Sequence, residues 1–229
     1  MTQTSTLTRP LKIDFVSDLV CPRGAVGLGG LTTALERLKA DGITAEIHFQ
    51  PFELSPDMSP QGENLDEHIG RKYGASPQQL ASSREAVRQR AAGVGFDFNS
   101  SSRSHVYNTF DAHRLLHWAG LAGRQRELKK ALFRANFTDD ANVADHEVLA
   151  ALAAGAGLDA GEAREVLSSG RYGAEVRAAE QLWQSRGIHS VPGVIINGKW
   201  LVSGGQPPEV FERALREIAR QPAQGAARP

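Results

Sequence analysis

The sequence predicts an α/β protein in which both ends of the chain build one sheet and a long helical insertion separates them. Near the start, two segments of strand-like pattern flank an amphipathic helix, which indicates a β-α-β unit. Near the end, a β-branched run, an Asn-Gly turn and a further amphipathic helix indicate a β-β-α unit. The residues between the two units show helical patterns almost throughout, so we expect a discontinuous domain around an inserted one.

The first unit begins with residues 11–17 (LKIDFVS), whose apolar side chains predict a buried strand. An apolar stripe at helical spacing follows, formed by Leu28, Leu31, Leu35 and Leu38. Pro22 suits the first helical turn because its missing N–H would have no helical partner, and Gly42 is a typical helix terminator. In residues 43–49 apolar and polar side chains alternate, which predicts a second strand with one polar face.

The middle of the chain predicts helices only. Asn64 and Glu67 resemble a capping box ahead of a short helix, and Ser76-Pro77 opens the next one toward Val94. Further helical stretches cover residues 108–120, 125–137, 145–154, 159–168 and 173–186. We therefore assign residues 59–186 to an all-helical insertion domain.

The second unit closes the fold. Residues 194–196 predict a strand, Asn197-Gly198 is a strong hairpin signal, and residues 200–202 predict the returning strand. Pro207-Pro208 then opens a last helix. The discontinuous domain accordingly comprises residues 11–58 and 187–220, and residues 221–229 form a flexible tail rich in Pro, Ala and Gly.

The composition excludes several classes of function. The chain has 229 residues with 26 Lys plus Arg and 26 Asp plus Glu, so its formal net charge is zero. A nucleic-acid-binding surface needs excess basic residues to displace counterions, so we expect no nucleic-acid partner. No segment reaches the ~18 apolar residues of a membrane helix, and the first dozen residues lack the apolar stretch of a secretory signal. We expect a cytoplasmic protein without a membrane partner.

Cys21 is the only cysteine, which excludes an internal disulfide and a zinc site built from several thiolates of this chain. It stands at the start of the first predicted helix, where unpaired N–H groups and the helix dipole favour a thiolate. Arg23 adds a permanent positive charge two residues away. We therefore predict a reactive thiol with a lowered pKa, the alternative being a small buried apolar residue. The run Gly27–Gly30 could leave room beside this thiol for a ligand.

The sequence resembles the DsbA-like thioredoxin family, in particular its cytosolic FrnE-type branch. The matching blocks are IDFVSDLVCP (13–22), FQPFELSPDM (49–58), NTFDAHRLLHWA (108–119), ALFRANFT (131–138) and GIHSVPGVIINGKWLVSGGQ (187–206). The resemblance covers about residues 13–219. It implies a thioredoxin-like fold with a large all-helical insertion.

The family's Cys-X-X-Cys motif corresponds here to Cys21-Pro22-Arg23-Gly24, so the first thiol is present and the second is replaced by glycine. In the family mechanism the first cysteine attacks a substrate disulfide and the second resolves the mixed disulfide. Gly24 cannot resolve it. Cys21 would then need an external thiol such as glutathione, which we expect as a co-substrate and not as a permanently bound cofactor.

The resemblance also implies the residues that surround the thiol. It places Val191 and a cis Pro192 opposite the active cysteine, with Ser190 beside them, as the platform for a peptide or glutathione. It places polar ligand contacts at Gly204 and Gln206 before the last helix. Two glycines there also fit a plain turn. Phe52, after the second strand, either lines the cleft or packs in the core.

His113 and His117 stand four residues apart, a spacing that could bind a metal ion. Arg114 occupies the position where the zinc-peptidase motif requires Glu, and no third ligand is apparent. We therefore expect two histidines on the surface or in the core, and no metal site.

Three functions remain open from the sequence. The first is a thiol–disulfide oxidoreductase of the DsbA family that acts through Cys21 alone on a thiol or disulfide substrate. The second is a glutathione-dependent isomerase or transferase, like the hydroxychromene-carboxylate isomerases and kappa glutathione transferases of the same fold, which also lack a resolving cysteine. The third is a non-catalytic binding module that kept the cleft and lost the redox pair. Fold alone does not decide among them.

Overall fold

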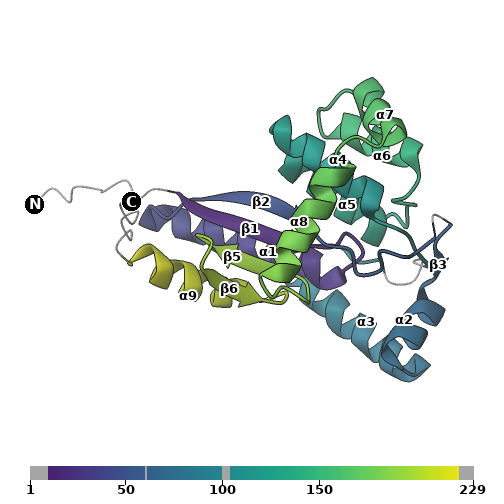
Figure 1. The fold of residues 1–229 in the computed structure, drawn as a ribbon. Helices are drawn as coiled ribbons and strands as arrows, with labels where there is room; N and C mark the ends of the chain where they lie inside the picture. The colour runs from purple at the N-terminus through teal and green to yellow at the C-terminus, as the bar shows by residue number, and fades with distance from the viewer. Residues whose placement is uncertain (1–9, 60, 100–103, 222–229) are drawn as a thin grey trace, which may run out of the picture.

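The computed structural model describes residues 10–59, 61–99 and 104–221. Its central sheet has four strands in the order β2-β1-β5-β6 (Figure 1). The strands are β1 (Leu11–Ser17), β2 (Ala45–Pro51), β5 (Gly193–Ile196) and β6 (Trp200–Ser203). β1 runs parallel to β2 and antiparallel to β5, and β5 pairs antiparallel with β6. The two ends of the chain therefore build one sheet, which confirms the predicted fold.

Two helices of this domain cover one face of the sheet. α1 (Pro22–Leu38) continues into a single 3-10 turn at Lys39–Asp41 and packs against α9 (Pro208–Ala219). Side chains of β1 alternate between the faces: Ile13 and Phe15 belong to the main core with α1, whereas Val16 belongs to a smaller cluster on the opposite face. β1 is thus buried on both faces from Ile13 onward, and this burial includes two polar residues, Asp14 and Ser17.

The predicted hairpin is confirmed between β5 and β6. Ile196 pairs with Trp200, so residues 197–199 form the loop. Asn197 and Gly198 both have positive φ, 52° and 68°, and the N–H of Lys199 donates a hydrogen bond of 3.1 Å to the carbonyl of Ile196 across them. The side-chain oxygen of Asn197 also accepts a hydrogen bond of 2.9 Å from the N–H of Lys12, at the start of β1. The turn residue therefore closes the hairpin and joins it to the central strand.

The insertion is helical, as predicted, with boundaries within a few residues of those expected. Its helices are α2 (Leu65–Tyr73), α3 (Pro77–Ala92), α4 (Phe110–Leu121), α5 (Gln125–Phe137), α6 (His146–Gly155), α7 (Ala160–Ser169) and α8 (Gly173–Ser185). Two short strands that the sequence did not predict, β3 (Glu63–Asn64) and β4 (His105–Val106), pair with each other. Strands of two residues carry no periodicity that a sequence pattern could reveal.

Side-chain caps set several of these helix starts. Ser76 and Gln79 form a reciprocal capping box at the start of α3. Asn64 accepts hydrogen bonds from the N–H groups of Asp66 and Glu67 at the start of α2, and Asp145 caps α6. The capping residues therefore explain why the sequence locates these helix starts well.

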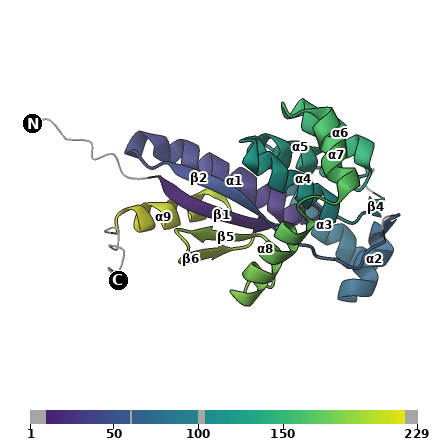
Figure 2. The same ribbon diagram turned by 45° about the horizontal axis from the view of Figure 1, so that its top comes forward.

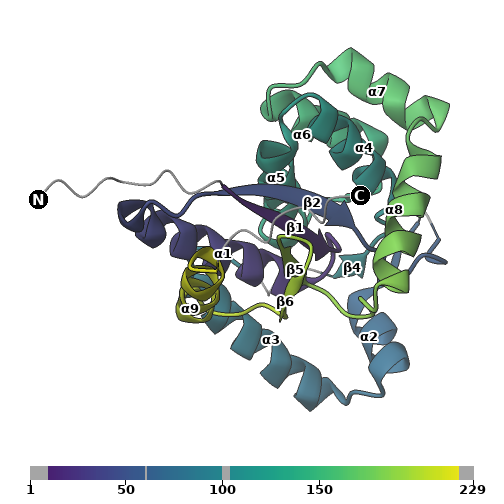
Figure 3. The ribbon, with the colours of Figure 1, turned by 60° about the vertical axis from the view of Figure 1, so that its left-hand side comes forward.

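The insertion divides into two groups of helices around the sheet. α4 and α5 contact β2, α6 and α7 pack on them, and α8 also reaches β2. α3 packs instead against α1, and α2 lies beside α3 (Figures 2 and 3). The C-terminal ends of β1 and β2, with the first turn of α1, therefore lie where both groups meet the sheet (Figure 3).

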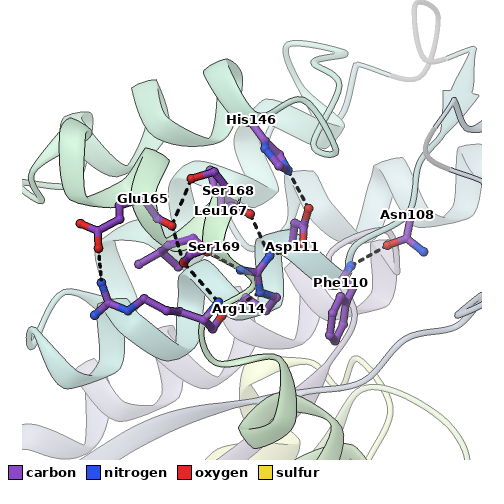
Figure 4. A network of polar contacts seen from close by, with 11 residues as sticks. Asn108, Phe110, Asp111, Arg114, His146, Glu165, Leu167, Ser168 and Ser169 are labelled. Carbon is purple, nitrogen blue, oxygen red and sulfur yellow. Dashed lines mark hydrogen bonds and ion pairs between the residues drawn. The ribbon is translucent and has the colours of Figure 1, made fainter.

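Arg114 of α4 holds the outer helices of the insertion together (Figure 4). Its side chain is 3% exposed and donates hydrogen bonds to backbone carbonyls of Val166, Leu167 and Arg171, which end α7 and the following turn. It also pairs with Asp111 at 2.6 Å. These carbonyls have no partner within the helix, so the guanidinium acts as a C-terminal cap supplied by another helix.

Replacing Arg114 with methionine is expected to lower the free energy of unfolding by about 2–5 kcal/mol, because it leaves buried carbonyls without a donor. Urea unfolding followed by circular dichroism measures the loss. Arg164→Met is the matched control, because the pair of Arg164 with Glu147 is exposed and should contribute less than about 1 kcal/mol. Equal stability of the two variants would contradict the capping role of Arg114.

Two expectations fall largely outside the described part of the chain. The expectation that the first dozen residues hold no secretory signal falls on residues 1–9 for its larger part, which lie outside the described ranges, and all of the tail except Gln221 also lies outside them. Within the described ranges, no helix is both long enough and apolar enough to cross a bilayer.

Candidate active site

Cys21 lies directly before the first turn of α1, as predicted. It is the N-cap residue of the helix and has an extended backbone, and Pro22 occupies the first helical position. Its carbonyl accepts a hydrogen bond of 2.9 Å from the N–H of Gly24. The residue is 6% exposed, so the thiol lies in an enclosed site at the C-terminal end of β1.

The loop before β5 faces this thiol. The peptide bond between Val191 and Pro192 is cis, as the family resemblance implied. The Cys21 thiol lies 3.5 Å from the carbonyl oxygen of Val191 and donates a hydrogen bond to it. The structure thus brings Cys21 and Val191 together from positions 170 residues apart in the sequence.

Cys21 belongs to a small cluster of buried apolar side chains. Phe52 packs in a cluster with Cys21, Val191, Trp183 of α8 and Ile188. Phe52 therefore packs in the cluster that contains Cys21, and its contact with a substrate stays a prediction.

Ser190 is exposed next to this cluster, and Arg23 is exposed at the helix start. Both can meet an incoming substrate without any rearrangement of the core. Their contacts with a substrate stay predictions.

The segment before α9 lies against the first turns of α1. A Cβ at Gly205 would lie 2.6 Å from the carbonyl oxygen of Arg23, so only glycine fits this contact. The side chain of Gln206 donates a hydrogen bond of 2.8 Å to the carbonyl of Ser203 within its own turn. Gly204 and Gln206 are therefore near the helix that carries Cys21, and their predicted ligand contacts remain predictions.

The glycines of α1 do not leave room for a ligand, and this expectation was wrong. A Cβ at Gly27 would lie 3.3 Å from both Gly205 and the ring of Pro192, and one at Gly30 would lie 2.5 Å from the carbonyl oxygen of Gln206. A Cβ at Gly29 would collide with Val94. These glycines allow close packing of α1 against its neighbours.

The predicted lowering of the Cys21 pKa was also wrong. Burial raises the pKa of this thiol, and the carboxylate of Asp18 raises it further. The N–H groups of Gly24 and Arg23 and the charge of Arg23 lower the pKa, but they do not outweigh these two effects. The helix start was visible in the sequence, whereas the enclosure of the thiol and the nearby carboxylate depend on the tertiary fold.

Asp18 is a functional candidate that the sequence analysis missed. It is 1% exposed, and its carboxylate accepts a hydrogen bond of 2.7 Å from the N–H of Leu54. Burial by itself would raise the pKa of Asp18, but His113, the Leu54 N–H and Thr109 hold it below the usual value. Asp18 is thus a stable negative charge close to the thiol, and its place three residues before Cys21 is the signal that could have found it.

Replacing Asp18 with asparagine is expected to lower the pKa of Cys21, because it removes a negative charge and keeps an acceptor for Leu54. The rate of alkylation by iodoacetamide against pH measures this pKa. The natural protein should show a midpoint above the value of about 8.5 of a free thiol. Asp14→Asn is the matched control, since Asp14 lies within β1, before this loop, and its carboxylate is paired with Lys12 and Gln50. A midpoint that Asp18→Asn leaves unchanged would contradict the electrostatic role of Asp18.

A cluster of buried charged groups continues from Asp18 into the insertion. Arg177 of α8 forms ion pairs with Glu53, which follows β2, and with Glu180. Burial, followed by the neighbouring Glu180, raises the pKa of Glu53 to about 7. Lys129 of α5 is fully buried, and burial lowers its pKa to about 7, although Asp18 and Cys21 oppose this change.

The two histidines of α4 have separate surroundings. Nε2 of His113 lies 3.6 Å from Asp18, whereas the ring of His117 lies against that of Tyr172 at 5.1 Å between centroids. Within the described ranges, no group of three or more His, Cys, Asp or Glu residues could hold a metal ion. The structure therefore assigns His113 to the buried charged cluster and His117 to an aromatic contact.

Known proteins share both the sequence pattern and the fold described above. The family model for the DSBA-like thioredoxin domain matches residues 12–216. The chain belongs to this family. A probable DsbA oxidoreductase from Streptomyces coelicolor is 35% identical, with a TM-score of 0.85 and 93% of each chain covered.

Two more distant structures share the fold of this DSBA-like chain. A cytosolic disulfide reductase, DsbM from Pseudomonas aeruginosa with GSH, is 18% identical, with a TM-score of 0.61 over 92% of this chain and 100% of that chain. A 2-hydroxychromene-2-carboxylate isomerase is 17% identical, with a TM-score of 0.66 over 91% of this chain and 96% of that chain. Proteins whose names give different activities thus share the fold found here.

Proposed function

We propose that the protein is a monothiol oxidoreductase that exchanges disulfides between glutathione and a thiol substrate through Cys21. The observation that carries this proposal is the position of the thiol at the start of α1, 3.5 Å from the carbonyl of Val191 in the loop before β5. Membership of the DSBA-like family and the absence of a second cysteine support it. The likeness to a reductase solved with GSH is a likeness of fold.

The proposed reaction has two exchanges. The Cys21 thiolate attacks the glutathione sulfur of a mixed disulfide, forms a Cys21–glutathione disulfide and releases the substrate as a thiolate. A second glutathione thiolate attacks that disulfide, restores Cys21 and leaves oxidised glutathione. One molecule of substrate mixed disulfide and one of glutathione thus give one substrate thiol and one oxidised glutathione. Gly24 takes no part, because it carries no sulfur.

The raised pKa of Cys21 gives this reaction a pH dependence. The thiol is the main form at neutral pH and the thiolate is the nucleophile, so the rate should rise with pH until the thiol has titrated. The helix N–H groups stabilise the thiolate once it forms. Asp18 opposes thiolate formation, so it disfavours Cys21 both as the nucleophile of the first exchange and as the leaving group of the second, because a thiol of higher pKa leaves more slowly.

The test uses the mixed disulfide of glutathione and 2-mercaptoethanol, with production of oxidised glutathione as the readout. We expect catalysis that requires added glutathione and is abolished in Cys21→Ser, because serine cannot form the disulfide. Mass spectrometry of the natural protein with the mixed disulfide should show one glutathione bound to Cys21. No adduct and no catalysis at any pH would overturn the proposal.

A second candidate is a glutathione-dependent isomerase or transferase, which the enclosed and protonated state of Cys21 favours. A thiol held in this state can donate its S–H to a bound glutathione thiolate without forming a covalent bond. Serine can also donate a hydrogen bond, so Cys21→Ser would then keep glutathione binding and turnover. Turnover in Cys21→Ser therefore separates the two functions, because the disulfide exchange is abolished in that variant.

A further inference from the structure

A second pocket lies at the outer edge of β2, away from the cis-proline loop. It has a volume of about 570 Å³ and is bounded by β2, α4 and α5, a size typical of sites for small organic ligands. Its lining includes neither Cys21 nor Pro192. The pocket is therefore distinct from the site of the proposed thiol chemistry.

Apolar side chains form much of the wall. Phe49 of β2 and Leu116 and Leu121 of α4 line it. Gln125 of α5 accepts a hydrogen bond of 2.9 Å from the N–H of Phe49 and donates one of 3.0 Å to its carbonyl. The backbone N–H and carbonyl of Phe49 thus already have hydrogen-bond partners. This part of the wall is therefore formed before any ligand binds.

A buried nitrogen atom without a partner belongs to a residue that lines the same pocket. Lys129 is fully buried, and its Nζ has no hydrogen-bond partner among the described residues. That nitrogen lies 4.6 Å from the centroid of the Phe133 ring. Nε2 of His113, by contrast, lies 3.6 Å from the carboxylate of Asp18, which is its ion-pair partner. Because a buried donor without a partner is unfavourable, the Lys129 nitrogen indicates a missing acceptor.

The charges around the pocket favour an anion. Arg126 and Lys129 of α5 line it, and Glu127 is the single carboxylate among the lining residues. Three histidines also line it, namely His48 of β2 and His113 and His117 of α4.

Asp18 and Cys21 act electrostatically on Lys129 from the loop after β1. Asp18 already accepts the Leu54 N–H and lies beside His113. This leaves the ammonium of Lys129 without a hydrogen-bonding acceptor of its own.

We propose that this pocket binds a small organic carboxylate with an apolar body, whose carboxylate is held by Lys129 and whose body lies against Phe49 and Leu116. The apolar wall, the paired edge of β2 and the unpartnered nitrogen of Lys129 carry this assignment. It does not depend on the redox activity of Cys21. A carboxylate forms a charge-assisted hydrogen bond with the Lys129 ammonium, which is stronger than one with a neutral acceptor.

Binding of hexanoate, 1-hexanol and hexylamine to the natural protein provides the first test, by calorimetry at about pH 6. The three probes have the same apolar body and differ in the head group. We expect hexanoate to bind at least about tenfold more tightly than the other two, because hydrogen bonds to a charged group contribute more than those to a neutral one. Equal affinities of hexanoate and hexanol, or no hexanoate binding, would overturn the proposal.

Lys129→Met and its neighbour Lys130→Met provide the second test. Lys130 is exposed on the same helix, so it is the matched control. We expect Lys129→Met to lose about tenfold or more in hexanoate affinity while Lys130→Met keeps it. Unchanged affinity in Lys129→Met would assign the binding to another site.

Proton uptake gives a readout independent of protein stability. The pKa of Lys129 is about 7 in the protein without ligand, so near pH 8 its amine is mostly neutral. A bound carboxylate favours the ammonium form, so hexanoate binding should take up a proton. Calorimetry in buffers of different ionisation enthalpy measures this uptake. His48, His113 and His117 also face the pocket, so the uptake must fall in Lys129→Met. Uptake that is absent, or equal in both proteins, would contradict the contact with Lys129.

Discussion

Lys129→Met is expected to unfold at higher urea concentration than the natural protein, with a free energy of unfolding larger by about 1–4 kcal/mol near pH 6. The ammonium of Lys129 is fully buried and has no hydrogen-bond partner among the described residues. Methionine has a similar length and no charge, so it can fill the space against Phe133 and Phe49 without this penalty.

The advantage of methionine should shrink as the pH rises. The pKa of Lys129 is about 7 in the folded protein and about 10.4 in the unfolded chain. Below about pH 7 both states carry the charge and its burial penalty is complete. Above that pH the folded protein releases the proton while the unfolded chain keeps it, so the stability of the natural protein rises relative to the variant.

Urea unfolding at about pH 6 and about pH 9 measures both effects. Lys130→Met should change little at either pH, because surface substitutions usually shift stability by no more than about 0.5 kcal/mol. If Lys129→Met were destabilised equally at both pH values, the ammonium would have a structural partner. If the variant is more stable and no longer binds hexanoate, the buried charge is retained for binding and not for stability.

The secondary structure was predictable because its signals are local. Asn197-Gly198 fixes the hairpin, and Ser76-Pro77 and Asp145 mark helix starts through their own hydrogen bonds. The cis bond at Pro192 was predictable from the family resemblance alone. Such features need only a few neighbouring residues, so the sequence contains them.

The electrostatics of the site were not predictable in the same way. The pKa of Cys21 depends on its burial and on Asp18, and both follow from tertiary packing. Lysine is usually a surface residue, yet Lys129 lies four residues before Phe133 on the buried face of α5. That spacing was the available signal, since residues four apart share one face of a helix.

Gly24→Cys is expected to restore a dithiol site once a buried aromatic neighbour, Phe133, has shifted slightly. The second sulfur would stand three residues after Cys21, the spacing of the family motif. A Cβ at position 24 would lie 3.2 Å from Cζ of Phe133, which is 1% exposed. Overpacking of this kind costs about 1–3 kcal/mol.

The companion variant Gly24→Cys/Phe133→Leu should relieve this contact. We expect it to form the disulfide more completely in a glutathione redox buffer than Gly24→Cys alone, as measured by mass spectrometry after alkylation. Phe137→Leu in place of Phe133→Leu is the control, because Phe137 is an equally buried aromatic residue of α5 that the Cβ at position 24 does not meet. If the control improved disulfide formation as much, the Phe133 contact would not be the obstacle.

The activity of the dithiol variant then tests the proposed function. With two cysteines, the mixed disulfide is resolved within the protein, so the substrate disulfide is reduced to two thiols while the cysteine pair is oxidised. An internal thiol replaces a dilute external one, so single-turnover reduction of a peptide disulfide without glutathione should be about tenfold or more faster than in the natural protein. Cys21→Ser in the same variant must abolish this gain, because the remaining cysteine lacks the position before α1. If the disulfide forms and the variant still reduces no peptide disulfide, the cleft does not admit such substrates, and the glutathione-dependent isomerase or transferase becomes the better assignment.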